Sequence, residues 1–260
     1  MMTVRIRWYL ILILSVVALL VPAIYAFAQE EDDTEALTNA AAVAYASGDF
    51  EQAATQYQAL IDSGWRSAAL YYNLGVAYFE AGDYGRALIA LRRAQQFAPR
   101  DDAINSTISR IRGARADFQR DPVNPVDLLA TTTYSTLRFT ELAWLALFSW
   151  GTWFTLIIVW QVTRRRLIIP VIAMGLLSVT VTTLFLSRAY ADHVRPPAVV
   201  TVLRATVYSG PNEEYLEIDT LYMAAELRVV DTVPGWARFE LPDGRQGWLI
   251  DDAITRVFKD

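Results

Sequence analysis

The chain has 260 residues, a formal net charge of −5 and no cysteine, and 54% of its residues are hydrophobic. The lack of cysteine excludes disulfides, thiolate metal sites and cysteine nucleophiles, and the single histidine, His193, all but excludes a histidine-based triad. The acidic balance argues against nucleic-acid binding, which needs a basic face. In a chain of two-domain length, the high hydrophobic content instead indicates membrane segments.

The N-terminus has the order of residues typical of a signal peptide. Arg5 and Arg7 precede an apolar run, and the small residues Ala26 and Ala28 suit cleavage after Ala28. We therefore expect residues 1–28 to be a signal peptide. Because the apolar run is nearly long enough to span a bilayer, an uncleaved anchor is the alternative. In both cases the basic flank stays in the cytoplasm and the residues that follow lie outside it.

Residues 29–120 predict an α-helical solenoid. Between residues 70 and 99, bulky and small side chains recur at steps of three, four and seven residues, which place them on common helix faces. Gly82 and Asp83 suit a left-handed helix end followed by an N-cap. The stretch resembles the tetratricopeptide (TPR) pattern of about 34 residues, and a weaker copy lies one period upstream. We expect two repeats and a solvated capping helix within residues 101–118. The bulky residues are Tyr71, Leu74, Tyr78 and Leu91, and the small ones are Gly75, Ala87 and Ala94.

Candidate partner-binding residues lie on the first helix of each repeat. TPR grooves bind peptides through such positions, which here include Asn39, Tyr72, Asn73, Val76 and Phe79. Asn73 can hold a peptide backbone through its amide, although an asparagine there can equally cap or bridge within the array. Tyr72 and Phe79 are the better candidates, because apolar side chains left over after the helix crossings are filled mark an interaction surface. The alternative is that this surface packs on the linker.

The middle of the chain predicts a two-helix transmembrane hairpin. Two uncharged runs of about 20 residues suit a hydrocarbon core of roughly 30 Å, and three arginines lie between them. The positive-inside rule places this arginine loop in the cytoplasm, so both flanking domains face outward. The expected order is a linker at 121–140, spans at 141–163 and 167–187 with the loop 164–166 between them, and a linker at 188–197.

Within the expected spans, aromatic and small polar residues predict how the two helices pack. Trp150 and Trp153 lie deep in the first span and are expected to face the second. The second span carries hydroxyl residues that serve packing or hydrogen bonds across the pair, namely Ser178, Thr180, Thr182 and Thr183. No Asp, Glu, Lys, Arg or His lies within the uncharged runs 142–163 and 167–187, which argues against an ion pathway or a proton relay.

The C-terminal residues, 198–260, change from helical to alternating periodicity. Five short strands separated by turn signals predict a small all-β barrel. The strings ATVYSGPNEEY and PGWARFELPDGRQGWLIDDAI resemble the bacterial SH3-like (SH3b) domain. Tyr215 and Trp236 are the candidate recognition residues of this domain, as aromatic residues are in SH3-type folds that bind peptides. The alternative is that these rings fill a barrel too small for a generous core.

Taken together, the predicted fold is a multidomain membrane protein with a TPR solenoid, a two-helix transmembrane hairpin and an SH3-like barrel. This order resembles the BatE proteins of the aerotolerance-operon type. The resemblance implies a non-enzymatic scaffold in the cytoplasmic membrane of a bacterium. Its implied partners are membrane-anchored von Willebrand A-domain proteins and a MoxR-type ATPase system. Two alternatives remain open, a cell-wall anchor or sensor that binds peptidoglycan, and a non-catalytic subunit of a membrane enzyme complex. We assign no residue to catalysis, to a cofactor or to a metal.

Overall fold

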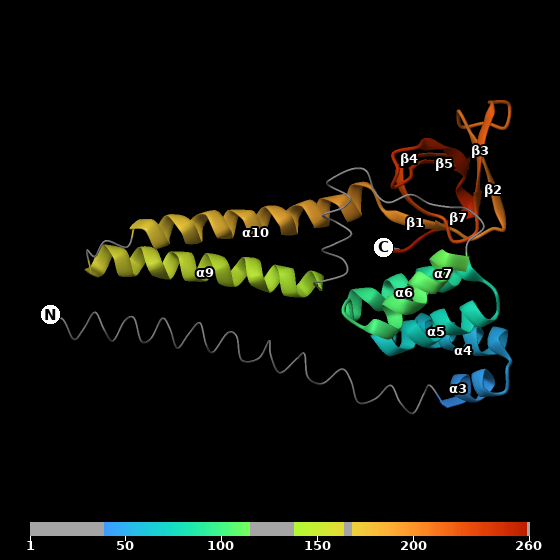
Figure 1. Ribbon diagram of the computed structural model, residues 1–260, viewed down its shortest axis with the longest axis horizontal. Coiled ribbons are helices and arrows are strands. Elements are labelled where there is room, and N and C mark those ends of the chain that lie inside the picture. The colour runs from blue at the N-terminus through green and yellow to red at the C-terminus, as the bar shows by residue number, and fades with distance from the viewer. Residues whose placement is uncertain (1–38, 115–137, 164–167, 259–260) are drawn as a thin grey trace.

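The computed structural model describes residues 39–114, 138–163 and 168–258 (Figure 1). The expected signal peptide, the arginine loop at 164–166 and most of the expected linker at 121–140 lie outside the described residues. The described part consists of a helical array, a long helical hairpin and a β-sheet.

The helical array is built from short antiparallel helices joined by tight turns. Gly48 and Gly82 adopt positive φ angles of 83° and 82°, and the aspartates that follow cap the next helices. Asp49 accepts a hydrogen bond from the backbone of Gln52, and Asp83 accepts one from Arg86. The predicted Gly-Asp turn is therefore confirmed in both repeats, at positions that lie 34 residues apart. The helices are α3 (Asn39–Ala46), α4 (Phe50–Asp62), α5 (Ala68–Glu80), α6 (Tyr84–Phe97) and α7 (Asp102–Ala114).

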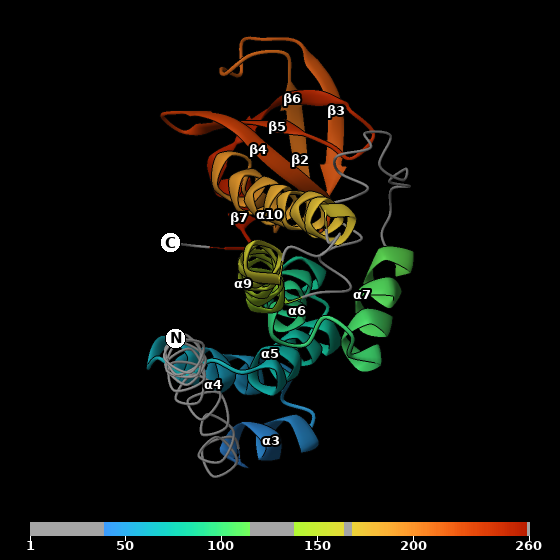
Figure 2. The same cartoon turned by 90° about the vertical axis from the view of Figure 1, so that its left-hand side faces the viewer.

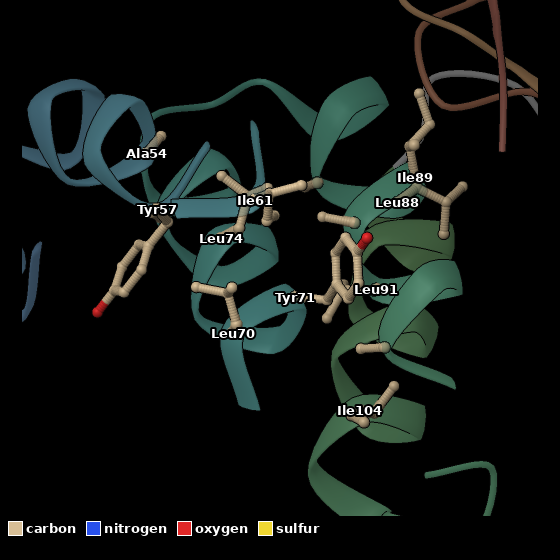
Figure 3. Close-up of a cluster of buried hydrophobic side chains, with 14 of the residues drawn as sticks. Ala54, Tyr57, Ile61, Leu70, Tyr71, Leu74, Leu88, Ile89, Leu91 and Ile104 are labelled. Carbon is tan, nitrogen blue, oxygen red and sulfur yellow. The ribbon is translucent and has the colours of Figure 1, made fainter. Parts of the chain in front are cut away.

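The core of the array lies where α5 crosses α6. Leu74 and Leu91 are buried there, and Figure 3 shows both within the apolar cluster. Gly75 faces the same crossing, because a Cβ atom added to it would lie 2.7 Å from Cγ of Leu91. Ala87 and Ala94 are fully buried on α6. The small residues thus lie at the close approach that the repeat pattern predicts.

The hairpin consists of α9 (Phe139–Thr163) and α10 (Ile168–Val194), which run side by side in opposite directions (Figure 1). The indole nitrogen of Trp150 donates to the hydroxyl of Thr182 at 2.8 Å, and that of Trp153 donates to the carbonyl of Val171 at 2.9 Å. Gly175 makes room for the second indole, since its Cβ would lie 2.8 Å from the nitrogen of Trp153. Both tryptophans face the partner helix, as the sequence predicts.

Both hairpin helices are long and apolar enough to cross a membrane. The two stretches are Phe139–Thr163 and Ile168–Tyr190. In the most apolar 18 residues of each, only 17% and 11% are buried inside the protein. A core helix of a soluble protein would be mostly buried. Length, composition and exposure therefore agree with the expected spans, without placing either end on a particular side.

The C-terminal region forms one antiparallel sheet in the order β3-β2-β6-β5-β4-β1-β7. Apolar side chains alternate inward along the central strands, with Ala205, Val207, Ala237, Phe239 and Leu249 in its core. The strands are β1 (Pro197–Val200), β2 (Arg204–Tyr208), β3 (Glu217–Tyr222), β4 (Glu226–Val233), β5 (Trp236–Glu240), β6 (Gln246–Ile250) and β7 (Ile254–Arg256).

The sheet differs from the predicted five-stranded barrel in two ways. It has two further strands, β3 and β7, and these lie at opposite edges of the order without pairing to each other. The barrel is therefore not closed. The pattern missed β3 because four of its six residues are exposed in succession, and missed β7 because it has only three residues. Helix α6 packs against β1, next to the edge strand β7.

The helical array and the sheet lie at the same end of the hairpin. Figure 2, which looks along the hairpin, shows the sheet on one side of its axis and the array on the other. Helices α6 and α7 lie nearest the sheet (Figure 1). The two regions therefore meet although the whole hairpin separates them along the chain.

Candidate protein-interaction faces

The helical array presents a face made by its first helices, α3, α5 and α7. Tyr72, Val76 and Phe79 recur on α5 at steps of four and three residues, and all three are half-buried. The guanidinium of Arg110, on α7, lies 4.7 Å from the centre of the Phe79 ring. Tyr45, on α3, is half-buried as well. We call these five residues the first-helix face.

The surroundings of Tyr45 include the other polar groups on this side of the array. Partial burial raises the pKa of the Tyr45 phenol, Glu80 and Tyr72 raise it further, and Arg110 lowers it. The face therefore combines aromatic rings with one cation, and the carboxylate of Glu80 lies beside it. Such a surface can hold an apolar side chain of a partner and orient a charged group beside it.

The rings of this face are held by contacts within the array. Tyr45 meets the edge of the Phe50 ring at a centroid distance of 5.2 Å, and Phe79 lies against Tyr84 at 5.5 Å. Tyr72 and Phe79 also pack on the edge of the array's core. Because these contacts fix their rotamers, the rings present a preformed surface rather than one ordered only by a partner.

The two asparagines predicted to bind a partner differ in what the structure describes of their side chains. Asn73 is half-buried on α5, and no hydrogen bond joins its side chain to another described residue, so its amide can bond to a partner. Asn39 is the first residue of α3, and its side chain lies outside what the structure describes.

Arg110 was missed as a site residue because α7 was interpreted as a solvated cap. The repeat period could have identified Arg110 as a site residue, because Arg110 follows Val76 by one 34-residue period. Equivalent positions in stacked repeats line the same surface. Extending the repeat register into α7 would have placed this arginine beside Phe79.

The sheet presents a second aromatic surface on the side opposite its core. Trp236 meets the edge of the Tyr208 ring at 5.4 Å, and Tyr208 lies opposite Trp248 in the β2–β6 pairing. Successive side chains of a strand point to opposite faces of the sheet, and each of the three rings is next to a buried residue in its strand. All three rings therefore point away from the core. We call Tyr208, Trp236 and Trp248 the sheet aromatic cluster.

Tyr215, the other predicted recognition residue, lies apart from this cluster. It is in the β2–β3 connection, is 52% exposed, and has no ring contact with Trp236 among the described residues. Its ring packs over Gly210, where an added Cβ would lie 2.6 Å from the ring. The structure thus groups Trp236 with Tyr208 and Trp248 rather than with Tyr215.

The described residues contain no group of three or more histidine, aspartate or glutamate side chains that could hold a metal ion.

Residues 38–102 match the family model of the tetratricopeptide repeat. This match covers α3 to α6 and the first residue of α7, so every member of the first-helix face except Arg110 lies within it. TPR arrays generally mediate contacts between proteins.

The other comparisons add little. No curated protein sequence matches the chain. Among solved structures, the chain is similar to NlpC2 from Trichomonas vaginalis, with 21% identity and a TM-score of 0.22. The similarity covers 25% of this chain and 24% of that chain, so the chain spans about a quarter of that protein. A likeness of this extent supports no inference about fold or function.

Proposed function

We propose that this chain is a membrane-anchored scaffold that binds partner proteins through the first-helix face of its TPR array. The observation that carries the proposal is the cluster formed by Tyr72, Phe79 and Arg110 within residues that match, or directly follow, the TPR family model. Interaction surfaces are enriched in aromatic residues and arginine that are anchored by their own contacts. A partner segment with an apolar side chain and a nearby acidic group complements this face.

The apolar hairpin and the sequence signals together support a location for the scaffold. Both hairpin helices suit a bilayer, and the basic N-terminal flank and the arginine loop predict that the array and the sheet lie outside the cytoplasm. A chain of this kind would hold its partners at the outer surface of a bacterial cytoplasmic membrane.

The sequence resemblance supports a finer proposal. A BatE-like role would make the partners other membrane-anchored envelope proteins, von Willebrand A-domain proteins among them, working with a MoxR-type ATPase. In this role the chain contributes surfaces rather than chemistry, and it is not itself an enzyme. The C-terminal sheet would then act as an SH3-like module.

The sheet aromatic cluster favours a second candidate function. Three neighbouring rings on an outward sheet face suit stacking against sugars or peptides, and the cell wall supplies both. In this alternative the chain is a cell-wall anchor or sensor that binds peptidoglycan through Trp236 and its neighbours.

One experiment separates these candidates. The tagged chain is purified from detergent-solubilised membranes after mild crosslinking, and whatever follows it is identified by mass spectrometry. We expect Tyr72→Glu and Phe79→Glu to reduce the recovery of membrane proteins about tenfold or more, because each places a charge in an apolar contact. Val43→Glu is the matched control, because Val43 lies on α3 outside the first-helix face and is 69% exposed.

The outcomes are distinct. Loss of membrane proteins in Tyr72→Glu and Phe79→Glu but not in Val43→Glu supports the scaffold, provided circular dichroism shows an intact array. Unchanged recovery in the two face variants shows that this face is not the site. Recovery of wall fragments alone, abolished by Trp236→Ala, would instead establish the anchor or sensor.

A further inference from the structure

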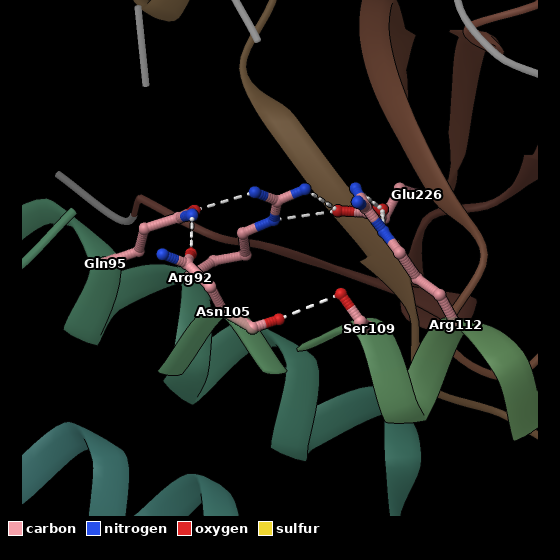
Figure 4. Close-up of polar contacts among 6 residues, drawn as sticks. All are labelled: Arg92, Gln95, Asn105, Ser109, Arg112 and Glu226. Carbon is pink, nitrogen blue, oxygen red and sulfur yellow. Dashed lines mark hydrogen bonds and ion pairs between the residues drawn. The ribbon is translucent and has the colours of Figure 1, made fainter. Parts of the chain in front are cut away.

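The carboxylate of Glu226, at the start of β4, is held by two arginines from the helical array (Figure 4). One oxygen accepts hydrogen bonds from Nε and Nη2 of Arg92, on α6, at 2.8 and 2.5 Å. The other accepts them from Nε and Nη2 of Arg112, on α7, at the same distances. Only 18% of the Glu226 side chain is exposed. Two forked guanidiniums thus use both oxygens of one nearly buried carboxylate.

A hydrogen-bonded row behind Arg92 orients these groups. Arg92 donates from Nη1 to Gln95 at 2.7 Å, and Gln95 in turn donates to the side chain of Asn105 at 2.7 Å. Gln95 is buried on α6 and Asn105 lies on α7, so the row joins the two helices that reach Glu226 (Figure 4). This support reduces the entropy that the arginines lose when they bind the carboxylate.

Apolar and backbone contacts extend the same junction. Val199, Ala224 and Val257 of the C-terminal region belong to the buried cluster of the helical array. Arg93, on α6, donates from Nε to the carbonyl of Val257 at 2.7 Å. The junction therefore combines a shared apolar core with an ion pair in which the carboxylate is nearly buried.

Gly85 shows how closely the two regions approach. A Cβ atom added to this residue of α6 would lie 2.8 Å from the carbonyl oxygen of Val200 and 2.9 Å from Cα of Thr201. Both are backbone atoms, which cannot move aside as a flexible side chain can. The junction accordingly depends on the absence of a side chain at Gly85.

The contact closes a long loop of the chain. Glu226 follows Arg92 by 134 residues and Arg112 by 114, and the whole hairpin lies between. Two weaker ion pairs lie at the same end of the hairpin, one where the chain enters α9 and one where it leaves α10. Arg100 meets Glu141 at the start of α9, and Arg195 meets Glu240 just after α10, each at 3.3 Å. These exposed pairs contribute little to stability, so Glu226 is the main polar tie.

We propose that Glu226 is an interdomain clasp that locks the C-terminal sheet onto α6 and α7. The clasp makes the array and the sheet one rigid unit that presents the first-helix face and the sheet aromatic cluster in a fixed arrangement. A partner that touches both surfaces is then bound at two points, and the second contact forms at a high effective concentration. This last step rests on the proposed scaffold function, whereas the clasp itself does not.

The test measures the distance between the two regions in the full chain. Because the chain has no cysteine, spin labels can be attached only where cysteines are introduced. Gln96→Cys on α6 and Asp231→Cys on β4 provide two exposed positions. Pulsed electron spin resonance in nanodiscs then reports the distribution of distances, and we expect one narrow peak for the otherwise unaltered chain.

Two variants open the clasp by different physical means. Glu226→Gln removes the charge and keeps the side-chain shape, which leaves Arg92 and Arg112 without their counter-ion. Gly85→Ala keeps every charge and introduces the clash with the sheet backbone. Both should broaden the peak or move it to longer distance. Gly113→Ala on α7 is the matched control, because a Cβ there meets nothing within 4 Å, and its distribution should not change.

The results separate the clasp from the function that builds on it. A broad distribution in the parent chain, or a parent-like peak in both variants, would overturn the clasp. Partner recovery is measured on the same variants, and an opened clasp should lower it about tenfold. Recovery that persists with an open clasp would overturn two-point binding. No recovery from the parent chain would count against the scaffold proposal alone.

Discussion

At the scale of single residues, the two arginines around Glu226 change the acidity of its carboxyl. Burial by itself would raise the pKa of its carboxyl, but the charges of Arg92 and Arg112, together with their hydrogen bonds, lower the pKa from 4.5 to about 2. The ionised form is therefore stabilised in the folded protein relative to the unfolded chain. The two arginines outweigh desolvation because each forms two hydrogen bonds with the carboxylate.

The lowered pKa predicts how stability depends on pH. A depressed carboxyl pKa contributes stability that is fully present above about pH 4.5 and is lost as the pH falls toward 2. We expect Glu226→Gln to lower the free energy of unfolding at pH 7 by on the order of 3 kcal/mol. Denaturant unfolding followed by circular dichroism checks this value, and the difference from the parent chain should shrink as the pH approaches 2. A difference that is constant with pH would contradict this account.

At the scale of elements, α7 has a different role from the one its sequence indicates. Its buried isoleucines form the predicted stripe against the array, but Arg112 binds Glu226 of the sheet instead of standing free in solvent. The stripe is Ile104, Ile108 and Ile111. The last helix of the array is thus held from two sides, by its own apolar face and by the C-terminal region.

This double attachment predicts a local effect of Arg112→Gln. Loss of the ion pair removes one of the two supports of α7 while Arg92 still binds Glu226. We expect the backbone amides of residues 102–114 to exchange hydrogen several-fold faster, with α4 and α5 unaffected. Hydrogen exchange followed by mass spectrometry measures this directly. Arg110→Gln on the same helix is the control, because Arg110 contacts Phe79 rather than the sheet, and equal effects of the two substitutions would disprove the assigned role.

At the scale of the whole molecule, the hairpin and the junction impose one topology. Because α9 and α10 run antiparallel, the start of α9 and the end of α10 lie at the same end of the hairpin (Figure 1). The helical array precedes α9 along the chain, and the sheet follows α10. Their direct contact through Glu226 requires both to lie on one side of any membrane that the hairpin crosses.

Single introduced cysteines test this topology. We expect Asp102→Cys on the array and Asp231→Cys on the sheet to react with a membrane-impermeant maleimide in intact cells, because the positive-inside rule predicts that both regions lie outside the cytoplasm. Thr163→Cys, at the opposite end of the hairpin, should react only after the membrane is permeabilised. Labelling of Asp102→Cys and Asp231→Cys from opposite sides would rule out the junction, and reversed labelling of all three would rule out the proposed location.

Much of the fold could be predicted because its signals are local. The Gly-Asp turns, the small residues at the α5–α6 crossing and the two apolar helices depend on neighbours a few residues away, so their patterns are visible in the chain. The sheet was predicted less completely. Exposed β3 lacks alternation, and β7 is only three residues long, so both become strands through pairing with β2 and β1.

By itself, the sequence predicted the repeat, the apolar hairpin and some aromatic residues of the two candidate faces, namely Tyr72, Phe79 and Trp236. Only the tertiary structure decided which of those residues lie together. It placed Arg110 over Phe79, grouped Trp236 with Tyr208 and left the sheet open with α6 against β1. Glu226 and Arg112 are charged residues of the kind that water normally solvates at a protein surface. Their pairing spans 114 residues of chain, and no local pattern encodes it, because the partners meet only after the array and the sheet have both formed.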